Sequence, residues 1–344
     1  MKSVFFDGKG NLEIKEIDKP SIKPDEVLIK VKCSGVCTTD LHSFYGESVS
    51  EGDSPYPLVP GHEVSGIVEK VGNEVHELKI GDKIAIDPFV PCNECFFCKN
   101  RKYHYCQNVR TIGTNINGGF AEFLAAPASS VHKFEGIDYD AAALAEPLST
   151  VIYGQERCNI EFGDELLIIG AGPMGLLHLQ LAKHTGAKRI VVVDVQKDRL
   201  KKAEELGAEV INAKVGSGTE STKKILESTR YGYDVVIEAT GIAKVVEASV
   251  DLLNYNGRLL IFGVAPQKSK VTYNPYTLYR NDYQIIGAFA LNKTLEKAVN
   301  MLSNGILDVS SVLGKKYKLS EMETALSDLE NKRASGKLQI TFDH

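Results

Sequence analysis

Four cysteines crowd into one short segment in the first half of the chain. They follow the spacing C-x2-C-x2-C-x7-C and are Cys92, Cys95, Cys98 and Cys106. Four thiolates can close a tetrahedral site with no exchangeable position, which is how proteins hold structural zinc. An iron–sulfur cluster and four unused thiols are the alternatives. Because cysteines at this density, without a signal peptide, are more typical of metal binding than of disulfides, we predict structural zinc.

A second group of possible metal ligands lies upstream of this lobe. Cys37, Asp40 and His42 stand close together, and His62 and Glu63 follow soon after. A lone cysteine or histidine is usually just a packed side chain. Together, however, a thiolate, an imidazole and a carboxylate supply the three protein ligands of a catalytic zinc site, which keeps one position open. The grouping therefore predicts a second, open metal site.

A glycine-rich turn in the second half of the chain predicts a dinucleotide site. Gly170, Gly172 and Gly175 fit G-x-G-x-x-G, directly after the apolar run 166–169 and before a helical stretch. These glycines permit a tight turn, close approach of the backbone to a pyrophosphate, and close packing of helix on strand. The pyrophosphate would lie at the helix N-terminus. Glycines are also common in ordinary turns, so this interpretation depends on the strand, the helix and a following acid.

The acid is Asp194, at the end of the next apolar run. A carboxylate at this place accepts hydrogen bonds from the adenosine ribose hydroxyls. Its charge would repel the 2′-phosphate of NADP, so we expect NAD as the cofactor. Arg199 follows nearby and could flank the adenine, or simply be a solvated helix residue.

The elements that must position these residues differ between two parts of the chain. Alternating strand patterns and turn residues recur up to residue 149, for example at 26–32 and 64–72, as in an antiparallel barrel-like domain. From residue 150, short apolar strands alternate with helices, which predicts an α/β domain with a right-handed, doubly wound parallel sheet. The simplest division is a β-rich domain, 1–149 plus 286–344, that contains an inserted Rossmann domain, 150–285.

Composition and charge exclude several classes of function. The 344 residues are 43% hydrophobic and 25% charged, with a net charge of −5. This composition is ordinary for a globular protein, and the charge argues against nucleic acid or an anionic membrane as partner. The N-terminus lacks the apolar core of a signal peptide, and no run of about 18 apolar residues predicts a membrane span. We expect a soluble cytoplasmic protein.

In this order along the chain, the motifs resemble those of the zinc-containing medium-chain alcohol dehydrogenases over nearly the full length. The matching segments are Gly-Val-Cys37-Thr-Thr-Asp40-Leu-His42, Gly61-His62-Glu63, the cysteine lobe, the glycine turn with Asp194, and Glu238-Ala-Thr240-Gly. The resemblance implies a GroES-like catalytic domain, two zinc ions and NAD. It also adds Pro173, Met174 and Thr240 to the cofactor-binding residues.

The resemblance further implies roles for single residues. Cys37 and His62 would bind the catalytic zinc, with Glu63 as an exchangeable or neighbouring carboxylate, and Asp40 would orient His62.

A proton relay follows from the same resemblance. Thr39 would accept the alcohol proton and pass it through the ribose hydroxyls to His42, and so to solvent.

The third protein ligand separates the branches of this family. Simple alcohol dehydrogenases place a cysteine near the domain junction, where this chain has Glu146 in the sequence Leu-Ala-Glu-Pro-Leu-Ser. This is similar to the polyol dehydrogenase branch, in which the glutamate binds zinc directly or through its water. A carboxylate makes the zinc more Lewis acidic and suits substrates with adjacent hydroxyls. We expect Cys33 and Cys158 to be packed thiols.

The resemblance implies an oxidoreductase that transfers hydride between a secondary alcohol and NAD. The expected substrate is a sugar alcohol, a related diol or a polyol phosphate. Sorbitol is disfavoured because Ala290 and Ser43 stand where sorbitol enzymes carry an arginine and a tyrosine. Basic residues that could meet a phosphate are Arg280, Lys293 and Lys337, but we expect surface or cofactor-side charges.

Two alternatives remain open. One is an enzyme like L-threonine 3-dehydrogenase, and the other is an inactive protein that binds zinc and NAD(H). The apolar run 285–289 could extend a sheet across a two-fold axis, as in members of this family, so we expect a homodimer or homotetramer. The same run could also be an ordinary sixth strand.

Overall fold

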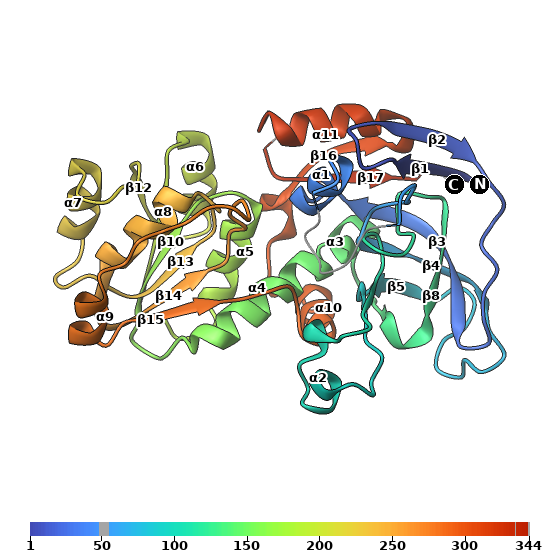
Figure 1. Ribbon diagram of the computed structural model, residues 1–344, viewed down its shortest axis with the longest axis horizontal. Helices are drawn as coiled ribbons and strands as arrows, with labels where there is room; N and C mark the ends of the chain where they lie inside the picture. The colour runs from blue at the N-terminus through green and yellow to red at the C-terminus, as the bar shows by residue number, and fades with distance from the viewer. Residues whose placement is uncertain (48–54, 334, 343–344) are drawn as a thin grey trace. The chain divides into compact units, whose positions relative to one another are not determined.

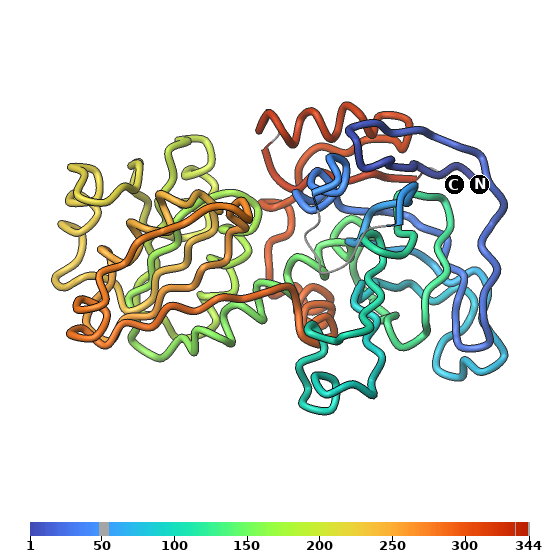
Figure 2. Tube along the Cα trace, viewed as in Figure 1, coloured from blue at the N-terminus to red at the C-terminus, as the bar shows by residue number. Residues whose placement is uncertain are grey.

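The computed structural model describes residues 1–47, 55–333 and 335–342, and the chain forms two compact units. Unit 1 comprises Met1–Ser149 and Leu291–His344, and unit 2 comprises Thr150–Ala290. Figure 2 shows the early blue and final red parts of the trace in the same unit. The expected boundary at residue 285 is wrong, because strand β15 (Gln284–Gly287) pairs with β14 (Leu253–Ile261) in unit 2.

Unit 1 is built on a sheet of seven strands, in which all pairs are antiparallel except that of β16 (Leu313–Lys318) with β17 (Lys337–Thr341). Strand β8 (Phe123–Pro127) pairs with β3 (Glu26–Gly35) beside the main path. The order of the path is β16 (Leu313–Lys318), β17 (Lys337–Thr341), β3 (Glu26–Gly35), β4 (Glu63–Val71), β5 (Lys83–Ile86) and β9 (Val131–Lys133). Val27, Ile29 and Val31 alternate along β3 and are fully buried, so the period of two places one face of this strand in the core.

Smaller elements complete unit 1. Two short sheets pair β1 (Lys2–Phe6) with β2 (Leu12–Glu16), and β6 (Phe89–Val90) with β7 (Arg110–Thr111). The helices are α1 (Thr38–Phe44), α2 (Phe96–Lys99), α3 (Tyr139–Ala143), α10 (Leu295–Ser303) and α11 (Met322–Glu330). Helix α4 (Ala145–Cys158) begins in unit 1 and ends in unit 2.

Unit 2 contains a six-stranded sheet in which every pair is parallel (Figure 1). Its order is β12 (Glu209–Asn212), β11 (Arg189–Asp194), β10 (Glu165–Ile169), β13 (Tyr233–Glu238), β14 and β15. The order reverses between β10 and β13, which is where doubly wound sheets bind dinucleotides. Its other helices are α5 (Pro173–Ala182), α6 (Lys197–Glu205), α7 (Glu220–Glu227), α8 (Ala243–Ser249) and α9 (Pro275–Asn281).

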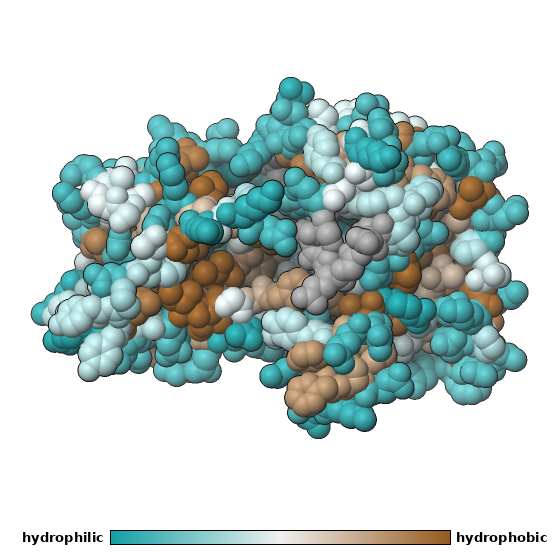
Figure 3. All heavy atoms as spheres, in the orientation of Figure 1, coloured by the Kyte–Doolittle hydropathy of each residue, from teal (hydrophilic) through white to brown (hydrophobic). Residues whose placement is uncertain are grey.

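The surface drawn in Figure 3 is mainly hydrophilic, with hydrophobic areas between the polar side chains. Scattered exposed hydrophobic residues are normal for a folded protein. Within the described part of the chain, every helix is too short or too polar to cross a membrane.

Candidate metal centres and cofactor site

Three side chains predicted as metal ligands come together in unit 1. Cys37 directly precedes helix α1, and His62 directly precedes strand β4, whose first residue is Glu63. Strands β3 and β4 pair so that Gly35 lies opposite Glu63, which brings the end of β3 beside the start of β4. The ligand atoms of the three side chains lie within 4.8 Å of one another. A thiolate, an imidazole and a carboxylate at this spacing match the donors that zinc prefers.

Asp40 lies behind this group and orients it. Its Oδ2 atom accepts the backbone N–H of Cys37 at 2.8 Å, and its Oδ1 atom accepts that of Gly61 at 3.3 Å. The same Oδ1 atom lies 3.4 Å from Nδ1 of His62, whereas Nε2 lies 4.0 Å from Oε1 of Glu63. The imidazole therefore turns Nδ1 to Asp40 and Nε2 to the other candidate ligands.

Negative charge gathers around His62. Burial lowers the pKa of this imidazole, but the carboxylate of Asp40 and the thiolate of Cys37 more than compensate, and the net pKa is well above its usual value. Such a site is electrostatically suited to a cation, which would balance the surrounding anions.

A lysine that we expected at the surface also belongs to this site. Lys337 is 8% exposed, and its Nζ atom lies 2.5 Å from Oε1 of Glu63, which is 1% exposed. The expectation of a surface or cofactor-side charge is wrong for Lys337, because β17 runs next to β3 and carries its first residue into the interior. The only sequence signal was that Lys337 begins a strand whose other residues are mostly buried.

The two other basic residues named for a phosphate lie elsewhere. Arg280 is exposed on helix α9, and Lys293 lies 3.9 Å from the buried carboxylate of Asp87. Burial raises the pKa of Asp87 to about 6, although Lys293 opposes this shift.

Glu146 is buried near the start of helix α4 but lies outside the 4.8 Å group. Burial raises its pKa to about 7; the positive charge of a protonated His62 opposes the shift, and the carboxylate of Glu63 adds to it. Glu146 is thus close enough to interact electrostatically with the candidate ligands without joining their group.

Helix α1 carries the two residues predicted for proton transfer. Thr39 and His42 are half-buried and stand three residues apart, so they share one face of the helix. Nδ1 of His42 lies 2.6 Å from Oε2 of Glu47, whose side chain is mostly exposed. Glu47 was not predicted from the sequence. Its contact with His42 links the Thr39–His42 face of the helix to an exposed carboxylate.

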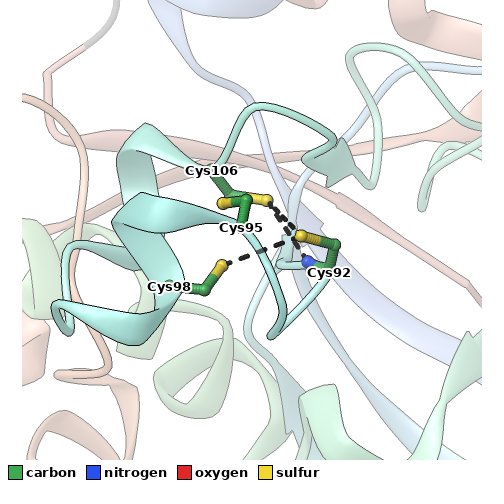
Figure 4. A group of neighbouring side chains, drawn as sticks. All are labelled: Cys92, Cys95, Cys98 and Cys106. Carbon is green, nitrogen blue, oxygen red and sulfur yellow. Dashed lines mark hydrogen bonds between the residues drawn. The ribbon is translucent and has the colours of Figure 1, made fainter.

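The four cysteines of the lobe form a second candidate metal site (Figure 4). The Sγ atoms of Cys92, Cys95, Cys98 and Cys106 lie within 4.8 Å of one another. The Sγ atom of Cys106 accepts the N–H of Cys92 at 3.2 Å, and the N–H groups of Cys98 and Gln107 lower the pKa of Cys95 to about 6. Burial has the opposite effect on Cys98 and Cys106 and raises the pKa of both thiols. The backbone donors favour the thiolate form at Cys95, which is the form that binds metal.

The two remaining cysteines belong to neither group. Cys33 and Cys158 are fully buried, and burial raises the pKa of both thiols. The structure places them as packed side chains.

In unit 2, the glycine turn joins β10 to α5. Gly170 has a φ of 106°, in the region that favours glycine, and a Cβ atom on Gly175 would lie 1.8 Å from the carbonyl oxygen of Gly170. A side chain at Gly175 would therefore force the helix away from the turn. Gly172 caps the helix, and Pro173 and Met174 in its first turn are half-exposed.

Asp194 ends β11 beside this turn. Its Oδ2 atom accepts the N–H of Ala171 at 2.7 Å, and its Oδ1 atom accepts that of Gln196 at 2.8 Å. The carboxylate thus holds the glycine turn, and carboxylate oxygens retain lone pairs for further donors. Nη1 of Arg199 lies 4.0 Å from where a Cβ on Gly172 would stand, so its guanidinium lies over the turn.

Thr240 reaches the same turn from the end of β13. Its Cγ2 atom would lie 3.1 Å from a Cβ atom on Gly170. Glu238, which is fully buried, accepts hydrogen bonds from the N–H of Thr240 at 2.7 Å and from that of Gly241 at 3.2 Å. The sequence motif placed Glu238 here, but its part in holding the Thr240 segment emerged only from the structure.

Comparison with known proteins gives matches in both units. The model of the alcohol dehydrogenase GroES-like domain matches residues 23–136, and that of the zinc-binding dehydrogenase family matches residues 173–304. D-arabinitol dehydrogenase 1 of Uromyces fabae is 32% identical over 97% of this chain and 95% of its own. D-altritol 5-dehydrogenase of Agrobacterium fabrum is 32% identical over 100% of both chains. The crystal structure of galactitol-1-phosphate dehydrogenase from Escherichia coli aligns with a TM-score of 0.88, at 26% identity, over 99% of this chain and 100% of that one.

Proposed function

The chain belongs to the polyol dehydrogenase branch of the zinc-containing medium-chain alcohol dehydrogenases, and on that premise we propose that it transfers hydride between a secondary hydroxyl of a polyol and NAD. One observation carries the proposal: the ligand atoms of Cys37, His62 and Glu63 lie within 4.8 Å of one another. A zinc ion held there would supply the Lewis acidity that lowers the pKa of a substrate hydroxyl.

Cys37, His62 and Glu63 are the protein ligands in this proposal. Glu146 would act from outside their group, as a hydrogen-bond partner for a water or substrate hydroxyl beside the metal. This division is supported by the burial of Glu146, by its electrostatic interaction with His62 and Glu63, and by its position outside the 4.8 Å group. A carboxyl with a pKa raised to about 7 can also take up or release a proton near neutral pH.

Thr39 and His42 remove the alcohol proton. Their shared face on helix α1 lets the Thr39 hydroxyl meet the substrate while the His42 imidazole hands the proton outward to Glu47 and water. In unit 2, the glycine turn and Asp194 hold the dinucleotide, which carries the hydride chemistry.

The substrate class follows from the relatives and from the charges of the site. The relatives named above act on sugar alcohols, one of them phosphorylated. Of the three bases considered for a phosphate, Lys337 is paired with Glu63 and Lys293 lies 3.9 Å from Asp87. These contacts favour an unphosphorylated polyol. Ala290 and Ser43 still disfavour sorbitol as the substrate.

A substrate panel tests the proposal. Polyols, diols, polyol phosphates and L-threonine are assayed for NADH formation, with and without a metal chelator. We expect chelator-sensitive activity on at least one unphosphorylated polyol. Activity on L-threonine alone would replace the substrate assignment. Binding of NADH without any alcohol-dependent reduction of NAD would show an inactive binding protein.

The same proposal includes a homo-oligomer formed through β15. This strand lies at the edge of the sheet, and Ile285 on it is 37% exposed. Analytical ultracentrifugation of an Ile285→Lys variant against the unchanged chain tests the interface. We also propose a reducing, cytoplasmic location, because the seven cysteines form no disulfide and four of them gather as a candidate metal site.

A further inference from the structure

Lys337 is a buried cation whose position the proposed chemistry does not yet explain. It is 8% exposed, and Glu63, its partner at 2.5 Å, is 1% exposed. A buried ammonium is costly unless it is paired with good geometry. The ion pair with Glu63 supplies such a partner inside the site.

The second carboxylate oxygen of Glu63, Oε2, has different surroundings from Oε1. The Oε2 atom is buried and has no hydrogen-bond partner among the described residues. A Cβ atom on Gly35 would lie 1.9 Å from this oxygen, so the carboxylate lies directly on the backbone of β3, two residues before Cys37. The bare backbone at Gly35 provides the space that the carboxylate occupies. One oxygen is thus held by a lysine, and the other lies buried against the backbone without a hydrogen-bond partner among the described residues.

We propose that Lys337 is the positioning residue of the catalytic metal site: it fixes Glu63 through Oε1 and so holds this carboxylate beside Cys37 and His62. This inference rests on the proposed function, because it takes Glu63 as a metal ligand. Lys337 also brings a basic side chain to a site that contains the sulfur of Cys37 and the buried carboxyl groups of Glu63 and Glu146.

The test is the affinity of the catalytic metal site, measured by chelator competition with zinc on the whole protein. The zinc ion of the cysteine lobe is the internal standard. We expect Lys337→Met to lower the affinity of the catalytic site about 10- to 100-fold, as loss of a partner that orients a ligand typically does. Lys337→Arg, which preserves the charge and the donor, should remain within a few-fold of the unchanged protein.

A matched control is Lys316→Met on the neighbouring strand β16. Lys316 forms an ion pair with Asp140 outside the metal group, so the affinity of the catalytic site should not change. Glu63→Gln and the double variant Lys337→Met/Glu63→Gln complete a cycle. If Lys337 acts only through Glu63, adding its substitution to Glu63→Gln has no further effect. The double variant also removes both buried charges together, which keeps the test open if Lys337→Met alone fails to fold.

Two results would overturn the inference in different ways. Unchanged zinc affinity in Lys337→Met, with reduced affinity in Glu63→Gln, would reject Lys337 as the positioning residue and leave the ligand assignment standing. Unchanged affinity in both variants would reject Glu63 as a ligand, and with it the proposed metal site.

Discussion

The Oδ1 atom of Asp40 lies 3.4 Å from the Nδ1 atom of His62, and both side chains are almost completely buried. The same carboxylate accepts the N–H of Cys37, so one residue orients two proposed metal ligands. A carboxylate behind a ligating histidine fixes the ring and raises its basicity. We expect Asp40→Asn to lower zinc affinity or turnover about 10- to 100-fold.

This prediction is checked by metal analysis and steady-state kinetics. Asp7→Asn is the control, because Asp7 accepts hydrogen bonds only within an exposed turn of its own segment, from Lys9 and Asn11. Equal zinc affinity and turnover in the two variants would contradict the role of Asp40.

The cysteine lobe should lose its zinc independently of the catalytic site. Removing one thiolate of a closed four-thiolate site, as in Cys106→Ser, should reduce the zinc content from two ions to one per chain. The unfolding midpoint should fall too, because metal binding contributes to the folding of such a lobe. Atomic absorption and thermal unfolding measure both effects, with Cys158→Ala as a buried control. Retention of two zinc ions would exclude a structural site here.

Asp194 should set the preference for NAD over NADP. Its oxygens already accept the N–H groups of Ala171 and Gln196, so the charge is held rigidly beside the glycine turn. We expect Asp194→Asn to reduce the discrimination against NADPH roughly 10-fold, or about 1.4 kcal/mol. Fluorescence titration of both reduced cofactors measures this change. If the ratio of the two dissociation constants does not change, another residue selects the cofactor.

Glu47 should assist proton release through His42. We expect His42→Gln to lower turnover up to about 100-fold, in the range of general acid–base catalysis, and imidazole buffer to restore part of it. Glu47→Gln should produce a smaller loss, because Nδ1 of His42 keeps a hydrogen-bond acceptor but loses the negative charge at 2.6 Å. A loss that imidazole does not relieve in either variant would point to altered folding of α1 rather than to proton transfer.

His178 should make unit 2 sensitive to acid. It is fully buried in α5, its Nε2 atom has no partner in the part of the chain that the structure describes, and burial lowers its pKa to about 3. The unfolded chain takes up a proton near pH 6.5, which the folded chain does not, so stability falls as the pH drops below that value. Between pH 7 and 5 the protein should lose about 2 kcal/mol more than His178→Leu. Urea unfolding at the two pH values measures the difference, and equal losses would show that His178 takes up no excess proton on unfolding.

Local sequence motifs were sufficient to predict the fold class and much of the candidate sites of this protein. The cysteine lobe and the glycine turn are contiguous, so their spacing alone limits which atoms can meet. The alternation of strands and helices likewise predicted the parallel sheet, and the match to known families confirmed the expected fold and enzyme class. The strand at 284–287 was ambiguous, because a short apolar run does not reveal which sheet it joins.

The tertiary structure decided the surroundings of the proposed catalytic metal. Lys337 and Glu63 are 274 positions apart, and only the pairing of β17 with β3 brings them together. Glu146 was predicted as a metal ligand from its motif, but its distance from the group depends on where α4 packs. A sequence shows which residues carry charge, whereas the cost of burying that charge and the partner that offsets it are properties of the folded chain.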